Sequence, residues 1–241
     1  MDTRFWGPDG WRLLHLITEN YPDNASIIEK NNYKFFFKSL PYVLPCIYCR
    51  KSLHKYMHSL PIDNYLNSKN DLCKWLYLIH NQVNNKLRMQ GLNDKPDPPF
   101  EFVKKKYEIY LVNLLSQNCI GMPGWNFIYT IMFNYPLVVN QIEYTRYLNY
   151  IIFIKYLGKV IPFPIIKNKY LEITSILEYN VILLSRENLT KWFHSTEKEI
   201  RLLLDCKCTN YSDRCKIIEK YRAGCGNGKD IKPTCRTNNS K

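Results

Sequence analysis

The fold is decided by the stretch Trp75-Leu76-Tyr77-Leu78-Ile79-His80-Asn81-Gln82-Val83-Asn84-Asn85-Lys86-Leu87. Its apolar residues recur with the period of an α-helix, so a long helix is predicted from Leu72 to about Gln90. Asn70 or Asp71 is expected to cap the first turn of this helix. Gly91 and the prolines that follow it are expected to form the turn behind it.

Four other helices are predicted around this one. They run from Asp9-Gly10-Trp11 to Tyr21-Pro22, from Ser26 to Ser39 with Ser26 and Glu29 as a capping box, from Cys46 to about His58, and from Phe100 to about Leu115. Pro41 and Pro45 are expected to break the chain before the helix that starts at Cys46. Four antiparallel helices plus a short fifth make an all-α four-helix bundle.

The second half of the chain repeats motifs of the first. Gly7-Pro8-Asp9-Gly10-Trp11 recurs as Gly121-Met122-Pro123-Gly124-Trp125, at an offset of 114 residues. Leu72-Cys73-Lys74-Trp75 matches Leu189-Thr190-Lys191-Trp192, at an offset of 117. The matches are collinear, so residues 119–205 are interpreted as a degenerate second helical bundle; chance similarity between two amphipathic helical stretches is the alternative. The predicted domains are therefore 1–112, 119–205 and a basic Cys-rich tail, 206–241.

The second copy keeps scaffold residues and loses polar and sulfur residues. Phe163 and Ile166 stand at the positions of Cys46 and Cys49. Tyr129, Glu197 and Arg201 stand at the positions of His15, His80 and Asn84. This contrast separates the residues that build the fold from those that carry chemistry.

Cys46-Ile47-Tyr48-Cys49 follows Leu44-Pro45 and would open a helix, where unpaired N–H groups and the helix dipole stabilise a thiolate. Ionised thiols are what disulfide exchange requires. A zinc site with His54 and His58 is the rival interpretation. Twelve residues of continuous helix separate Cys46 from His58 by about 18 Å, far beyond zinc–ligand distances, so no metal is predicted and both histidines are expected at the surface.

Two helical faces could hold a flat ring. Trp11 and His15 are four residues apart, as are His80 and Asn84, so each pair projects from one face. An aromatic plane beside imidazole and amide groups suits a heterocycle that needs stacking and hydrogen bonds. A buried tryptophan with satisfied core histidines is the plainer alternative.

Together, Trp11-x-x-x-His15, Tyr21-Pro22, Pro45-Cys46-x-x-Cys49 and the Trp75–Leu87 stretch resemble the Erv/ALR flavin-dependent sulfhydryl oxidases. The resemblance implies a helical bundle that holds FAD non-covalently, with Cys49 facing the flavin and Cys46 exchanging with the incoming thiol. The cofactor-binding residues that carry over by position are Trp11, His15, His80, Asn81, Val83, Asn84, Lys86, Leu87 and Tyr107. A basic residue just before Trp11 is not evident, and a structural disulfide of Cys73 would have Cys119 as its nearest candidate partner.

The implied activity oxidises thiols of protein substrates to disulfides and reduces oxygen to hydrogen peroxide. The extra helical domain looks like that of oxidases from large DNA viruses, which implies the host cytoplasm, a viral factory or the virion; the mitochondrial intermembrane space is the alternative. Association is expected through a homodimer of the first bundle or through an intrachain pseudo-dimer. No apolar run is long enough for a transmembrane helix.

Two features leave other interpretations open. The net charge of +13 would suit nucleic acid, so a basic, zinc-stabilised helical nucleic-acid-binding protein is the alternative function. Abundant Lys, Asn, Ile and Tyr, as an A/T-rich coding bias produces, weaken it. In the tail, Cys206 with Cys208, or Cys225 with Cys235, could shuttle electrons between substrate and Cys46-x-x-Cys49. The tail cysteines, which include Cys215, could instead form structural disulfides, or four of them could bind zinc.

Overall fold

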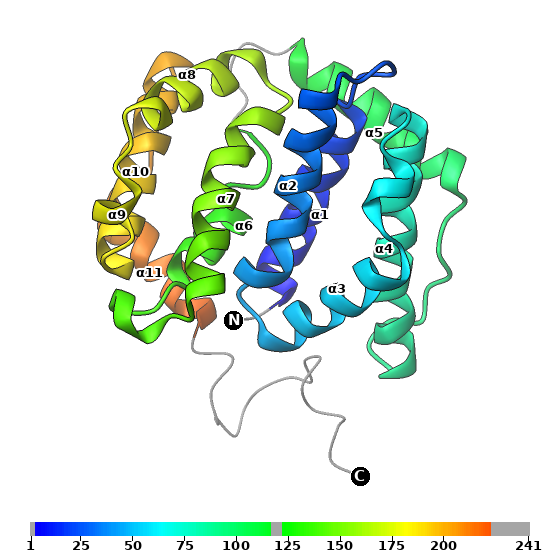
Figure 1. Ribbon diagram of the computed structural model, residues 1–241, viewed down its shortest axis with the longest axis horizontal. Coiled ribbons are helices and arrows are strands. Elements are labelled where there is room, and N and C mark those ends of the chain that lie inside the picture. The colour runs from blue at the N-terminus through cyan, green and yellow to red at the C-terminus, as the bar shows by residue number, and fades with distance from the viewer. Residues whose placement is uncertain (1–2, 117–121, 223–241) are drawn as a thin grey trace.

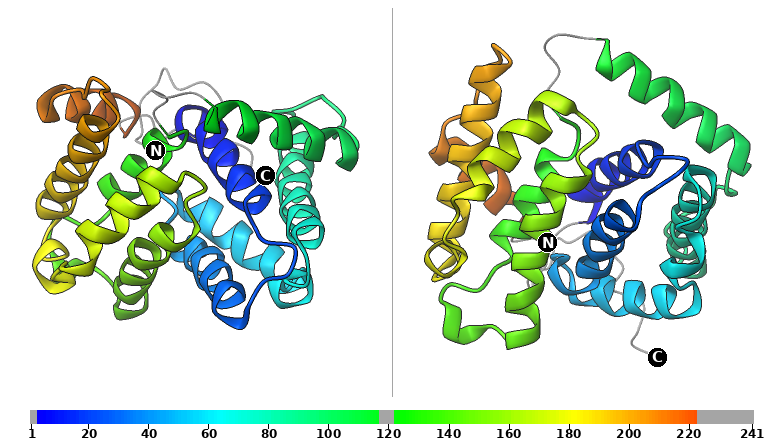
Figure 2. Two further views of the ribbon diagram at one scale, coloured as in Figure 1. Left: turned by 90° about the horizontal axis from the view of Figure 1, so that it is seen from above. Right: turned by 45° about the horizontal axis from the view of Figure 1, so that its top comes forward.

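The computed structural model describes residues 3–116 and 122–222 and is helical throughout, with no β-strand in that part of the chain (Figure 1). Residues 3–116 and 122–222 form two helical halves that lie side by side (Figure 2). None of the helices in the described ranges combines the length and the hydrophobicity that a bilayer crossing requires. The predicted all-α class is confirmed.

The first half is the predicted bundle. Its elements are α1 (Thr3–Glu19), α2 (Ile27–Val43), α3 (Ile47–Ser59), the 3-10 helix η1 (Ile62–Tyr65), α4 (Lys69–Met89) and α5 (Phe100–Leu115). The α5 bounds agree with the prediction. Ser26 and Glu29 form the expected capping box at the start of α2.

Two predicted helix boundaries were wrong, and in both cases the helix continues through a proline. Helix α1 begins at Thr3 and runs through Pro8, and α2 runs through Pro41 to Val43. The buried Trp6 ring stacks on Phe127 at 5.8 Å, and Leu40 and Val43 are buried in the core. Burial of these side chains offsets the backbone hydrogen bond that each proline removes.

Two predicted helix starts also shift. Cys46 is the residue that precedes α3 rather than part of its first turn. Helix α4 starts at Lys69, and its cap is Ser68, not Asn70 or Asp71, because the Ser68 Oγ accepts the Asp71 N–H at 3.1 Å. A serine three residues before an acidic residue is a capping signal in its own right.

The second half contains α6 (Trp125–Phe133), the 3-10 helix η2 (Val139–Gln141), α7 (Tyr144–Val160), α8 (Pro164–Ser175), α9 (Tyr179–Ile182), α10 (Arg186–Leu203) and α11 (Tyr211–Arg222). Adding 117 to the first and last residue numbers of α2 gives those of α7. Adding 117 to those of η1 gives those of α9. The cap of α10 is Ser185, 117 residues after Ser68.

Buried tyrosines repeat as well. The Tyr21 hydroxyl donates to the Leu66 carbonyl at 2.8 Å, and the Tyr135 hydroxyl donates to the Leu183 carbonyl at 2.7 Å. The two tyrosines are 114 residues apart and the two leucines are 117 residues apart, which are the offsets of the sequence motifs. The two halves therefore share helix order, caps and internal hydrogen bonds.

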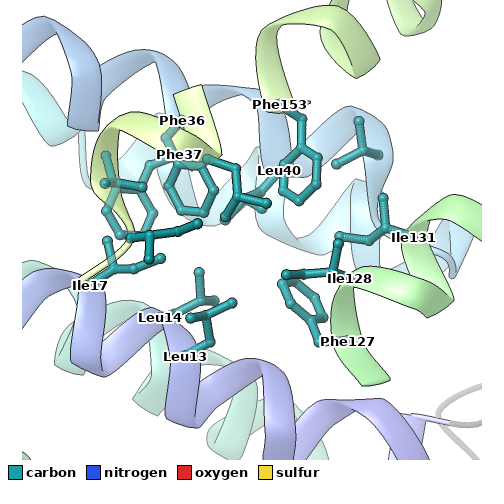
Figure 3. Close-up of a cluster of buried hydrophobic side chains, with 14 of the residues drawn as sticks. Leu13, Leu14, Ile17, Phe36, Phe37, Leu40, Phe127, Ile128, Ile131 and Phe153 are labelled. Carbon is teal, nitrogen blue, oxygen red and sulfur yellow. The ribbon is translucent and has the colours of Figure 1, made fainter. Parts of the chain in front are cut away.

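The halves meet through α1 against α6 and α2 against α7. Their shared core is apolar, and Phe36 packs on Phe153, its own counterpart at an offset of 117, with ring centres 5.8 Å apart (Figure 3). A residue that contacts its own equivalent lies beside an approximate two-fold axis.

Two glycines permit the close crossing of α1 and α6. A Cβ on Gly10 would lie 2.8 Å from the Phe127 ring, and one on Gly124 would lie 2.5 Å from Leu13. Gly124 is 114 residues after Gly10, and Phe127 is 114 after Leu13, so the two contacts are reciprocal. Gly124 also has φ of +106°, which disfavours other residues there.

Helix α11 lies within the stretch predicted to be a tail. It packs against α6, with Ile218 fully buried. Residues 211–222 therefore belong structurally to the second half.

Candidate functional site

A cavity of about 880 Å³ opens in the first half between α1, α3, α4 and α5. Its lining includes Cys49 and seven of the nine predicted cofactor residues: Trp11, His80, Val83, Asn84, Lys86, Leu87 and Tyr107. The structure thus brings together, from four helices, side chains that are up to 96 residues apart in the chain. His15 lies behind the lining, and Asn81 is not part of it.

Four aromatic rings form two stacked pairs beside the cavity. The Trp11 and His80 rings are 3.8 Å apart and nearly parallel. The His15 and Tyr107 rings are 4.3 Å apart, and the His15 Nε2 lies 3.2 Å from the His80 Nδ1. The hydrogen bond between the two imidazoles joins the two stacked pairs.

Both histidines are neutral at pH 7. Burial, then the charges of His80 and Lys106, lower the pKa of His15 to about 3. Burial also lowers the pKa of His80 to about 4, with Asp97 acting in the opposite direction. A neutral imidazole has one donor and one acceptor nitrogen. Each ring therefore uses one nitrogen in the hydrogen bond between them and keeps its other nitrogen for another partner.

The polar end of α4 is held by the loop that follows it. The Asn84 Nδ2 donates to Asp97 at 2.8 Å, and the Arg88 guanidinium donates to the same carboxylate at 2.7 Å. The Lys86 Nζ donates to the Ser52 Oγ at 2.8 Å, which ties α4 to α3. These bonds fix the side of α4 that faces the cavity.

The two cysteines differ in their surroundings. Cys49 is partly exposed and lines the cavity, whereas Cys46 is only 1% exposed. Between them, Ile47 and Tyr48 are exposed at 46% and 40%. The burial of Cys46 differs from the accessible position expected for the residue that meets incoming thiols. His54 and His58 are exposed on α3, as predicted.

Cations that the sequence did not assign also line the cavity. They are Arg4, Arg12 and Lys106, the last of which lies over the Tyr107 ring at 5.6 Å. Arg12 directly follows Trp11, and Lys106 directly precedes Tyr107, so adjacency to the two predicted aromatic residues was the available signal. These cations can hold the phosphates of a dinucleotide.

The similarity to a known protein family falls within the first half of the chain. The model of the Erv1/Alr family matches residues 8–108. An FAD-linked sulfhydryl oxidase of African swine fever virus is 34% identical over 82 residues, which cover 34% of this chain and 67% of that protein. The chain belongs to the Erv1/Alr family.

Two further relatives carry related names. A probable FAD-linked sulfhydryl oxidase of Acanthamoeba polyphaga mimivirus is 39% identical over 85 residues, covering 35% of this chain and 59% of that protein. The mitochondrial FAD-linked sulfhydryl oxidase of Saccharomyces cerevisiae is 29% identical over 107 residues, covering 44% and 52%. The chain therefore spans between half and two thirds of these two relatives.

The cavity of this Erv1/Alr chain suits the cofactor in those names. The neutral histidine pair and the stacked rings fit a flat heterocycle, and Arg12 and Lys106 fit a pyrophosphate. The residues present thus fit FAD.

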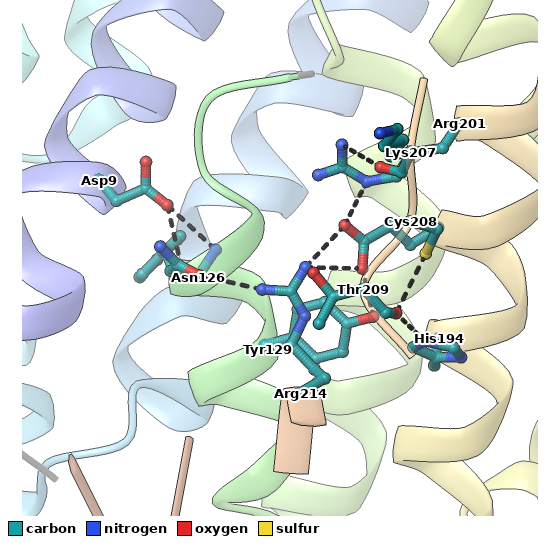
Figure 4. Close-up of polar contacts among 11 residues, drawn as sticks. Asp9, Asn126, Tyr129, His194, Arg201, Lys207, Cys208, Thr209 and Arg214 are labelled. Carbon is teal, nitrogen blue, oxygen red and sulfur yellow. Dashed lines mark hydrogen bonds and ion pairs between the residues drawn. The ribbon is translucent and has the colours of Figure 1, made fainter. Parts of the chain in front are cut away.

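The second half of this Erv1/Alr chain has a filled site at the corresponding place (Figure 4). The Tyr129 hydroxyl donates to Glu197 at 2.5 Å, where the first half has the His15–His80 bond. Glu197 has no exposed surface and also accepts from Arg201 and from Arg214 of α11, at 2.6 and 2.9 Å. The Arg214 guanidinium lies over the Tyr129 ring at 4.6 Å, so charged side chains occupy the space.

The remaining cysteines divide between described and undescribed parts of the chain. Cys73 is a buried thiol that donates to Glu19 at 3.3 Å, and burial, then the Glu19 charge, raises its pKa to about 12. Its candidate partner Cys119, and Cys225 and Cys235, lie outside the described residues. Cys206 and Cys208 are partly exposed after α10.

Proposed function

We propose that the first half is an FAD-dependent sulfhydryl oxidase that forms disulfides in protein substrates and reduces oxygen to hydrogen peroxide. The observation that carries this proposal is that Cys49 opens onto the same cavity as Trp11, His80 and Tyr107. A thiol and a flat-ring site in one cavity are what electron transfer from a dithiol to a flavin needs. The names of the viral and yeast relatives agree with it.

In this proposal each wall of the cavity has a task. Trp11 and His80 stack against the ring system, and the His15–His80 hydrogen bond holds them in place. Arg12 and Lys106 neutralise the phosphates. When bound, the flavin supplies a two-electron acceptor that can be reoxidised by oxygen.

The dithiol exchanges in two balanced steps. A substrate thiolate attacks the Cys46 sulfur of the Cys46–Cys49 disulfide, forming a mixed disulfide while Cys49 leaves as a thiolate. A second substrate thiolate then attacks its own half of the mixed disulfide, releasing the substrate disulfide and the Cys46 thiolate. Because Cys46 is buried, the turn between Leu44 and Ile47 must open for the first attack.

The experiment is oxygen uptake by the purified chain with dithiothreitol as substrate. Cys49→Ala is expected to abolish uptake while the protein stays yellow, because the cavity loses only one sulfur. Cys215→Ser, outside the dithiol and the cavity, should keep the wild-type rate. A colourless wild-type protein that carries zinc would overturn the proposal and favour the nucleic-acid-binding alternative.

We also propose that residues 122–205 are a degenerate second copy that covers the α1 and α2 surfaces within one chain. The shared helix bounds, the matching caps Ser68 and Ser185, and the reciprocal glycine contacts support this. An intrachain pseudo-dimer is thereby favoured over a homodimer of first bundles. Asn81, which does not line the cavity, is then a neighbour of the site rather than part of it.

Two finer proposals concern the tail and the place of action. Cys206 and Cys208 are partly exposed and remain candidates for an electron shuttle. If so, replacing both by serine should slow oxidation of a reduced protein substrate but not of dithiothreitol. The viral relatives favour the host cytoplasm over the mitochondrial compartment named for the yeast relative, and fractionation of expressing cells tests this.

A further inference from the structure

Two arginines, one from each half, hold the segment that leads into the dithiol. The Arg50 Nη1, from α3, donates to the Leu44 carbonyl at 2.7 Å. The Arg146 Nε, from α7, donates to the Tyr42 carbonyl at 3.1 Å. Both carbonyls lie within four residues of Cys46, so the second half of the chain contacts the backbone beside the candidate redox pair.

Arg50 interacts electrostatically with Arg146 and with both sulfurs. Burial, then the nearby charge of Arg146, lowers the pKa of Arg50, while Tyr150, Cys46 and Cys49 act in the opposite direction. Two cations held close together beside a buried sulfur are unfavourable alone and favourable next to an anion. A thiolate at the start of α3 would provide that anion.

The corresponding place in the second half lacks this arrangement. Arg146 corresponds to Glu29, and Arg50 to Lys167, both at an offset of 117. Hydrogen bonds from the Ser26 side chain and backbone, and then the charge of Lys167, lower the pKa of Glu29, so an acid and a base occupy these two positions. Two cations thus accompany the half that has cysteines, and an anion–cation pair accompanies the half with Phe163 and Ile166.

The other titratable groups around the dithiol do not supply a competing negative charge. Burial raises the pKa of Tyr150, on α7, to about 12 and also raises the pKa of Tyr56, on α3, so both phenols are neutral. On α4, Lys86 is bonded to Ser52. Arg50 and Arg146 therefore set the sign of the local charge.

We propose that Arg146, supplied by the second half, is a positioning residue for the dithiol: it fixes the Tyr42–Leu44 segment and, with Arg50, stabilises the thiolate of Cys46. The role of Arg146 in catalysis rests on the proposed oxidase activity. Its effect on the reactivity of Cys46 can be measured without that activity. The second half would then contribute to the active site as well as to the fold.

The test is the pH profile of iodoacetamide alkylation of Cys46 in the reduced full-length chain, read by peptide mapping. Arg146→Glu, which installs the residue of the first half, should slow alkylation at pH 7 about tenfold, as a shift of one pH unit in thiol ionisation would. Arg146→Lys should restore the rate to within about threefold, because it keeps the charge. Lys159→Glu, an equal charge change on the exposed far end of α7, should leave the profile unchanged.

The equilibrium of the dithiol with glutathione provides a second measurement that does not depend on access to Cys46. Arg146→Glu should shift this equilibrium toward the disulfide, because the reduced form loses the stabilised thiolate. If Arg146→Glu does not fold, Arg146→Met replaces it with a smaller expected shift in the same direction. Alkylation and glutathione equilibria that match the wild type would overturn the proposal. Absent oxygen uptake in the wild type would instead refute the oxidase function and leave these thiol measurements valid.

Discussion

His15 and His80 illustrate how a single buried pair connects stability to the site. Both imidazoles are neutral in the folded chain, with pKa values of about 3 and 4, whereas a histidine in the unfolded chain has its ordinary value near 6.5. Below pH 6.5 the unfolded chain therefore binds protons that the folded chain does not. The stability due to the neutral pair is fully present above pH 6.5 and is lost as the pH falls toward 4.

The first prediction follows from this sign. As the pH falls from 6 to 4.5, each histidine should lower the free energy of unfolding by about 1.4 kcal/mol per pH unit. Urea unfolding of the apoprotein, followed by circular dichroism across this range, measures the slope. His15→Gln should reduce the slope by the contribution of one histidine. His58→Gln, on the exposed face of α3, should not change it. An unchanged slope in His15→Gln would show that the pair is protonated in the folded state.

Asp9 shows how one helix can stabilise the start of another. Its carboxylate accepts the backbone N–H groups of Gly124 and Asn126, both at 3.0 Å, and of Phe127 at 3.4 Å. The residue that precedes α6, Gly124, has no side chain to do this itself. An acidic group at a helix N-terminus also interacts favourably with the helix dipole. The cap thus fastens α6 to α1 across 115 residues of sequence.

The second prediction is that Asp9→Ala lowers the free energy of unfolding by about 1–2 kcal/mol, the usual value for the loss of a helix cap. Asp9→Asn, which keeps an acceptor oxygen, should lose less. Asp23→Ala, at an exposed turn position, is the matched control and should stay near the wild type. Urea denaturation of all three variants measures the differences. Equal midpoints for Asp9→Ala and Asp23→Ala would mean that the cap carries no stability.

The same elements show what sequence can and cannot predict. Periodicity predicted α4 and α5, since their stripes of apolar residues are long. Local rules stopped α2 at Pro41, because they do not include the burial of Leu40 and Val43 against other helices. The role of Asp9 could not be predicted either, since its partners are in another part of the chain. Cavity residues were found by family resemblance, whereas Arg12 and Lys106 needed the folded geometry.

At the scale of the whole molecule, the surfaces of α1 and α2 are covered by α6 and α7 of the same chain. Phe36 and Phe153, which pack on each other near the approximate two-fold axis, have no exposed surface. A second copy of the chain cannot use this face without displacing the second half. The chain should therefore not associate through its first bundle.

The third prediction is that the protein has the mass of one chain, 28.8 kDa, in solution. Light scattering coupled to gel filtration, under reducing conditions and over a tenfold concentration range, measures it. The mass should not depend on concentration, since the apolar interface is already formed within the chain. Twice this mass at every concentration would contradict the pseudo-dimer, and cross-linking between first halves would identify the contact.

The fourth prediction is that the chain binds one FAD and not two. The first half offers a cavity with a neutral histidine pair, but the equivalent space holds Glu197 with Arg201 and Arg214. Removing that buried ion pair to admit a flavin would leave charges without partners, which costs several kcal/mol. Flavin released by heat, divided by protein from amino-acid analysis, should give a ratio of one. His80→Ala should weaken flavin binding about tenfold through loss of stacking and hydrogen bonding, whereas Glu197→Gln, at the equivalent position, should leave the ratio at one. A ratio of two would show that the second half also binds flavin. A ratio that decreases in Glu197→Gln would show the same.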